Sequence, residues 1–150
     1  MRLAITAQVD SSARAFTLVE VVVSVAVAAI LMAGLLVGYS QMLERAEWSA
    51  HSLAANSLAM QRLEQTRAAK WDTLATPAVD QLTASSFPVT IEVLDIPTVG
   101  TNVALATNIT TISTITADPP LRMIQVDCVW SFHNGRVFTN SLYTYRAPDQ

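Results

Sequence analysis

The first feature of the chain is a long hydrophobic segment close to its start. Residues 16–43 hold 21 hydrophobic side chains in 28 positions and a single charge, Glu20. Positions 21–43 are 23 consecutive uncharged residues, which as a helix would extend about 35 Å and cross a hydrocarbon core of about 30 Å. The pattern predicts a transmembrane helix over 16–43.

A cleaved secretory signal is the alternative interpretation of this segment. Arg2 and Arg14 give a basic leader, and residues 26–28 read Ala-Val-Ala, as at a signal peptidase site. The triplet lies in the middle of the apolar run, so cleavage there would fall inside hydrocarbon. Because basic residues precede the run and its other flank, 44–47, is mixed, we expect the leader in the cytoplasm and the remaining chain outside.

A helical stem is predicted directly after the span. Residues 44–74 are rich in Ala, Leu, Gln, Glu and Arg and contain no Gly or Pro, so we expect an amphipathic helix over 44–76 that stops at Pro77. Its expected sheet-facing stripe is Ala46, Ala50, Leu53, Ser57, Met60, Leu63, Trp71 and Leu74. His51 has no second metal ligand at a suitable spacing, so we expect it to have a structural role or to face solvent.

Residues 77–150 carry the alternation of a small antiparallel sheet. Positions 87–94 alternate as a strand with one apolar face, whereas the Thr-rich stretch 98–117 is expected to be a loop or an irregular edge strand. With the long helix before it, this sheet predicts an α+β fold of the form helix on sheet.

The clearest strand signal is a hairpin at the end of the chain. Two alternating runs, 121–132 and 136–146, flank a turn that contains Asn134-Gly135. A two-residue loop there would pair Phe132 with Val137 and, further along, Ile124 with Tyr145. The bulky residues of both strands would then share the packed face with Cys128, a free thiol expected to be buried.

Composition narrows the possible functions. The hydrophobic share is 51%, the charged share is 14% and the net charge is -3, which excludes a disordered chain and leaves no basic surface for nucleic acid. With two His and four Gly, the chain lacks a nucleophile elbow, a phosphate-binding loop and paired His, so we expect no enzyme, no cofactor and no metal site. Four carboxylates could converge on a cation, but scattered solvated groups are the better interpretation. They are Glu92, Asp95, Asp118 and Asp127.

Residues 13–21, Ala-Arg-Ala-Phe-Thr-Leu-Val-Glu-Val, carry a family resemblance. Followed by an unbroken apolar helix, they resemble the leader and helix start of type IV pilins and type II secretion pseudopilins. The resemblance implies that a prepilin peptidase removes leader 1–15 by cutting between Ala15 and Phe16, and that it methylates the new amine of Phe16. Glu20 would be the fifth-residue carboxylate of the mature chain. The family mostly has Gly where this chain has Ala15.

Glu20 admits two interpretations. A carboxylate in an apolar span is a functional candidate by default, yet four residues into the run it could simply mark the membrane interface. A new amine on Phe16 would be cationic near neutral pH and lie one helical turn from Glu20, so the two could pair within a subunit or between staggered subunits. In the same helix, Gly34 and Gly38 form a weak G-x-x-x-G signal for close helix packing.

Two further segments, 58–67 and 121–146, are similar to minor pseudopilins of the I type and minor pilins of the V type. This resemblance implies a pilin-like fold and a place in the tip or priming complex of a secretion or pilus-like filament. It also implies a single-pass protein of the bacterial inner membrane with a periplasmic C-terminal domain. Its partners would be other pilins or pseudopilins, the prepilin peptidase and the inner-membrane assembly platform. A membrane-tethered binding module and a minor pilin for adhesion or DNA uptake are the alternatives.

Overall fold

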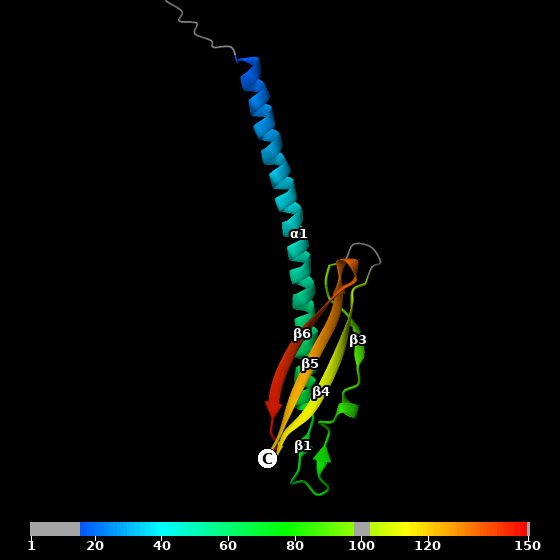
Figure 1. Ribbon diagram of the computed structural model, residues 1–150. Coiled ribbons are helices and arrows are strands. Elements are labelled where there is room, and N and C mark those ends of the chain that lie inside the picture. The colour runs from blue at the N-terminus through cyan, green and yellow to red at the C-terminus, as the bar shows by residue number, and fades with distance from the viewer. Residues whose placement is uncertain (1–15, 98–102, 150) are drawn as a thin grey trace, which may run out of the picture. The chain divides into compact units, whose positions relative to one another are not determined.

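The computed structural model describes residues 16–97 and 103–149 (Figure 1). The chain divides into two compact units, 1–43 and 44–150, which are treated separately below. The elements are α1 (Leu18–Ala68), β1 (Trp71–Asp72), β2 (Val79–Asp80), η1 (Ala84–Ser86), β3 (Thr90–Val93), β4 (Leu105–Ala117), β5 (Pro120–Phe132), η2 (His133–Gly135) and β6 (Arg136–Arg146). The expected leader 1–15 lies outside the described residues.

The first unit contains the apolar part of α1. Every side chain from residue 18 to residue 43 is exposed, including large ones such as Ile30 and Leu35 at 72% and 68%. By length and composition α1 is able to cross a membrane. Apolar surface of this extent is unfavourable in water, so lipid or other chains must cover it.

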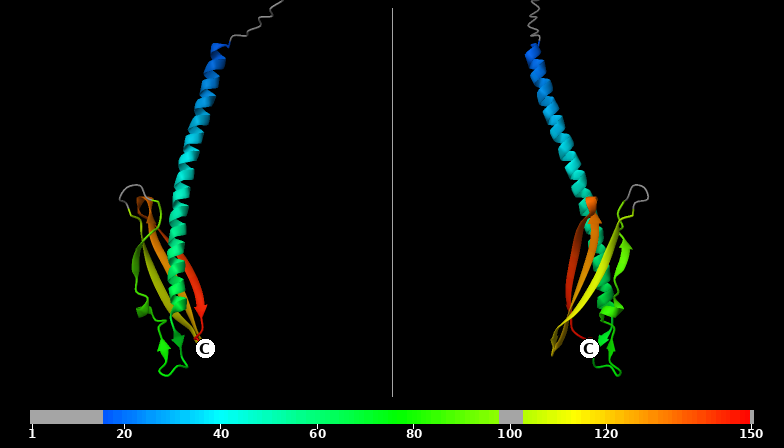
Figure 2. Two further views of the ribbon diagram at one scale, coloured as in Figure 1. Left: turned by 180° about the vertical axis from the view of Figure 1, so that it is seen from behind. Right: turned by 45° about the vertical axis from the view of Figure 1, so that its right-hand side comes forward.

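The second unit is an antiparallel sheet packed on the stem of α1. The strand order is β3-β4-β5-β6, and a separate pair of short strands, β1 and β2, lies beside it. Figure 2 shows the stem along one face of the four strands. Within this unit the helix and the sheet form two layers around one core, which confirms the predicted α+β, pilin-like arrangement.

The core lies between β5 and the stem of α1. From β5 it receives Ile124, Val126, Cys128 and Trp130, all at most 2% exposed, and the helix contributes Ala55 and Ala59 at 0%. Small helix residues let the backbone approach the sheet closely, so the bulky strand residues fill the space between the layers. Cys128 is buried on the packed face, as predicted.

The expected helix stripe is wrong for most of its members. The side chains that α1 buries are His51, Ala55, Ala59, Leu63 and Thr66. Leu53 is 72% exposed, because the bulk of β5 selects the Ala face of the helix and not the more hydrophobic one. The helix ends at Ala68, earlier than the expected 76, and the buried Trp71 belongs to β1.

The hairpin forms, but its predicted register is wrong by one residue. Phe132 pairs with Arg136 and Trp130 with Phe138, because the loop His133–Gly135 has three residues and not two. Gly135 has φ of +71°, which suits the left-handed position that ends such loops. A slip of one residue reverses the faces of β6, so Phe138 and Leu142 turn inward and Tyr143 is 56% exposed.

The Thr-rich stretch is also corrected by the structure. Residues 105–117 form the strand β4 and not a loop. β4 pairs with β5 along its length, with a register shift between Thr114 and Thr116, and with β3 only over residues 105–108. Its first part is therefore an inner strand, and residues 109–117 form the irregular edge that was the second expectation. Its inward positions Ala106, Asn108 and Thr110 are small or polar, which hid the alternation from a hydrophobicity pattern. The apolar face expected for 87–94 exists in β3, but Ile91 and Val93 point outward and are 69% and 57% exposed.

Candidate functional site

The candidate site is the start of α1, where the apolar segment begins. Leu18 is the first helical residue, and Thr17 stands at the N-cap position before it. The backbone N–H of Glu20 donates to the hydroxyl of Thr17 at 3.3 Å, and the N–H of Val21 donates to the carbonyl of Thr17 at 3.2 Å. The hydroxyl of Thr17 thereby satisfies one of the amide groups that the first turn of a helix leaves without a partner, and its carbonyl accepts the first bond of the helix.

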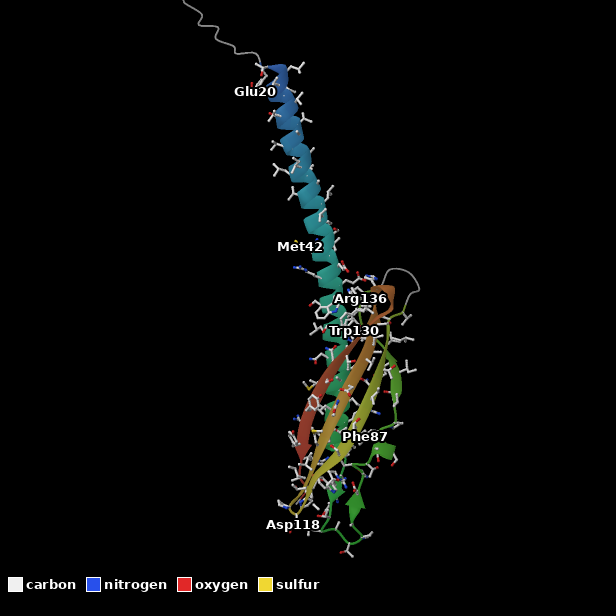
Figure 3. All side chains as sticks on the ribbon, in the orientation of Figure 1. Glu20, Met42, Phe87, Asp118, Trp130 and Arg136 are labelled. Carbon is white, nitrogen blue, oxygen red and sulfur yellow. The ribbon has the colours of Figure 1, made fainter. Side chains whose placement is uncertain are left out.

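Glu20 occupies the third helical position and is exposed (Figure 3). Thr17-Leu18-Val19-Glu20 is the T-x-x-E pattern of a capping box, and a carboxylate in the first turn also interacts favourably with the helix dipole. This helix cap was not among the predictions from the sequence, although the spacing of Thr17 and Glu20 is a readable signal for it. Glu20 therefore sits at the helix terminus and not within the interior of the helix.

Of the two residues that flank the expected cleavage bond, the structure describes Phe16 and not Ala15. Phe16 is the first described residue, directly before the cap, and its side chain is 77% exposed. Ala15, on the other side of the expected cleavage bond, lies outside the described residues. The structure thus brings Phe16, Thr17 and Glu20 to one helix end, where a chain that began at Phe16 would carry its amine next to the first turn.

The apolar part of α1 also has a shallow notch. Leu35, Leu36, Tyr39 and Met42 line it around Gly34 and Gly38, and the volume is about 440 Å³. A Cβ at either Gly would meet nothing within 4 Å, so the helix itself does not require these glycines. They leave room for another apolar chain to approach the helix backbone.

Ion pairs lie at the end of the second unit that carries β1 and β2. Arg122 donates to both carboxylate oxygens of Asp80, at 2.8 and 2.7 Å, and its guanidinium lies 4.3 Å from the ring centre of Trp71. The hydrogen bond from Arg122 holds the pKa of Asp80 below its usual value, and Asp80 in turn raises the pKa of Arg122. Arg146 and Asp149 form a second pair at 2.7 Å.

The remaining candidate residues have structural surroundings. His51 is 8% exposed and stacks on Trp130 with ring centres 5.6 Å apart, as expected for a structural histidine. Burial raises the pKa of the Cys128 thiol to about 11, so it stays protonated and unreactive at neutral pH. Within 16–97 and 103–149, no three His, Cys, Asp or Glu side chains are placed to hold a metal ion. Asp118 lies at the β4–β5 turn, at the opposite end of this unit from Arg136 (Figure 3).

Comparison with known proteins gives one match. Residues 10–36 match the prokaryotic N-terminal methylation motif, the prepilin-type signal of type IV pilins and pseudopilins. No curated protein and no solved structure matches the chain. The protein thus carries a prepilin-type signal at the head of a long apolar helix, together with a pilin-like fold. A signal of this kind implies a membrane-anchored structural subunit that is processed by a prepilin peptidase and assembles with other pilins.

Proposed function

We propose that the protein is a structural subunit of a pilin-like filament, assembled through the exposed helix 18–43. The observation that carries this proposal is the prepilin-type signal over 10–36, which includes the start of an apolar helix whose side chains are exposed among the described residues. Lipid covers such a helix before assembly, and the helices of neighbouring subunits cover it afterwards.

Processing creates a positive charge at the start of α1 that could pair with Glu20. Cleavage between Ala15 and Phe16 creates an α-amino group, methylated on Phe16, that is cationic near neutral pH. Glu20 then offers a carboxylate one turn away. In a filament with axially staggered subunits, Glu20 of the incoming subunit neutralises the amine of its neighbour within hydrocarbon. Removing one member of a desolvated pair typically costs about 3–5 kcal/mol, enough to prevent assembly.

Two further resemblances support a proposal for the position of the subunit. Similarity of 58–67 and 121–146 to minor pseudopilins of the I type and minor pilins of the V type supports a type II secretion or pilus-like system, with a place in the tip or priming complex. Basic residues in the leader support a cytoplasmic N-terminus and a periplasmic second unit. A tethered binding module, the alternative, would retain residues 1–15.

The test separates insertion, processing and assembly. Full-length protein is produced with and without a prepilin peptidase, and Glu20→Ala is compared with the unchanged chain. We expect both chains to enter the membrane and to be shortened by the peptidase, whereas only the unchanged chain is recovered in sheared filaments. Recovery of Glu20→Ala in filaments at normal amounts would contradict the role of Glu20. Failure of the unchanged chain to be shortened would contradict the filament function itself.

A further inference from the structure

The two edges of the four-stranded sheet differ in how open they are. β6 forms one border (Figure 1). The other border is β3 beside residues 105–108 of β4, and β4 itself over residues 109–117. β6 spans 11 residues, and between its terminal residues Arg136 and Arg146 it contains no charge, no Pro and no Gly. Exposed edge strands normally carry such features because unpaired backbone groups attract other strands. β3 is the protected part of the other border, because it has only four residues and is flanked by Pro88 and Pro97.

The direction of the strands allows the two edges to meet between copies that point the same way. Four antiparallel strands make β3 and β6 run in opposite directions. When two copies lie side by side with equal polarity, β6 of one and β3 of the next are therefore antiparallel. Subunits of a pilin-like filament have this common polarity, so the inference rests on the proposed function.

The registers also bring matching side chains together. Val93 pairs with Leu105 and Ser131 pairs with Val137, and the β4–β5 register places these two pairs in one row across the sheet. At equal height, Val137 of one copy therefore lies beside Val93 of the next. Both point to the outer face and are exposed, at 65% and 57%.

Charge at this end of the sheet is complementary. The exposed Arg136 begins β6, and the exposed Asp95 follows the end of β3 by two residues. In antiparallel pairing between copies, the start of β6 meets the end of β3. Arg136 of one copy and Asp95 of the next, which carry opposite charges, then lie at the same end of the junction. Two β6 edges facing each other antiparallel, with Ser141 at the centre, would instead oppose Arg136 and Arg146.

We infer that the β6 edge docks on the β3 edge of a second copy of this chain and continues the sheet from subunit to subunit. An interface between two different surfaces leaves one free copy of each surface at the ends of the row. Unless the rotation between copies closes a ring, further copies can therefore add and the row extends along a filament. The short β3 limits the junction to about four residue pairs. The inference rests only on the filament part of the proposed function, because a row of copies lies along a filament and differs from a single copy at its tip.

Cross-linking of the full chain in cells tests this inference. In a Cys128→Ser background, Val137→Cys and Val93→Cys are introduced singly and together and treated with a short bismaleimide. We expect a ladder of dimers and larger products when both cysteines are present, and no dimer from either one alone. Thr111→Cys, on an exposed outward position of β4 and away from the β6 edge, replaces Val137→Cys in the matched control and should give no ladder with Val93→Cys.

Charge reversal provides a second readout. Arg136→Glu should weaken the ladder at least several-fold, and adding Asp95→Arg should restore it. Dimers from Val137→Cys alone, or products with a different protein in place of the ladder, would overturn the inference. Absence of the ladder in subunits that still enter filaments would overturn edge pairing and leave the filament function intact, whereas loss of the unchanged chain from filaments would contradict that function.

Discussion

The hydroxyl of Thr17 accepts a 3.3 Å hydrogen bond from the backbone N–H of Glu20. This bond uses the backbone of Glu20, so its carboxylate is available to an amine on Phe16. Gln also fits the last position of a capping box, so Glu20→Gln removes the charge and keeps the cap. Thr17→Val does the reverse, since it removes the capping hydroxyl and keeps the carboxylate.

The first prediction uses this pair of variants. Glu20→Gln should be processed normally and be lost from sheared filaments. Thr17→Val should enter filaments, because losing a cap costs only about 1 kcal/mol of helix stability. Immunoblots of membrane and filament fractions measure both outcomes. The opposite ranking, with Thr17→Val excluded and Glu20→Gln incorporated, would assign Glu20 a purely structural role.

The second prediction concerns acid stability of the second unit. Because Arg122 lowers the folded pKa of Asp80, this pair stabilises the fold above the unfolded value of about 3.9, and its contribution disappears as the pH falls through the folded value. Asp80 is 39% exposed, so solvent screening limits the contribution to about 1 kcal/mol. Thermal unfolding of the full chain in detergent should show a smaller loss of stability between pH 5 and pH 2 for Asp80→Asn than for the unchanged chain, because the variant lacks the ion pair at every pH. An unchanged pH slope would contradict it.

The third prediction concerns Asn140, which joins the hairpin to the helix. Its side-chain oxygen accepts from the indole N–H of Trp130 at 2.8 Å, and its amide donates to the carbonyl of Ser52 at 3.1 Å. Asn140→Ala leaves the buried indole without this partner and should lower the free energy of unfolding by about 1–3 kcal/mol. Thr139→Ala, at the neighbouring outward position, should change it by less than about 0.5 kcal/mol. Urea unfolding followed by Trp fluorescence would show the two variants to be equal if the contact did not matter.

The fourth prediction concerns Cys128. With a pKa of about 11 and no exposed surface, the thiol should react with iodoacetamide at pH 8 only as fast as the fold opens. In urea the reaction should accelerate by orders of magnitude. Thr111→Cys in a Cys128→Ser background gives the reference rate of an exposed thiol. Rapid alkylation of native Cys128, at that reference rate, would be inconsistent with the packed core.

The sequence predicted those elements that depend on interactions between residues close together in the chain. The apolar run, the helix-forming stem and the Asn-Gly turn identified α1 and the β5–β6 hairpin, because each depends on residues close together in the chain. The face of the stem could not be read in this way: whether Ala55 or Leu53 turns inward depends on the volume that Trp130 and Ile124 occupy across the interface. Likewise, one extra residue in the loop at Gly135 reversed the faces of β6.

For the candidate site, too, local features could be predicted from the sequence and features that depend on distant segments could not. Phe16 and Glu20 stood out because a charge interrupts an apolar run beside a short motif. The Thr17 cap could have been predicted from its spacing to Glu20. The open edge of β6 could not have been predicted, because it depends on the positions of β3 and β4 in the sheet. The inward face of β4 is too polar to reveal that strand by hydrophobic alternation.

The central claim is that the chain is processed as a prepilin, and the mature N-terminus tests it most directly. Mass spectrometry of the protein purified from membranes that contain a prepilin peptidase should find a chain that begins at Phe16 and carries one methyl group on its amine. The same protein from cells without the peptidase should begin upstream of Phe16. Residues 1–15 still attached in the presence of an active peptidase would contradict the filament function.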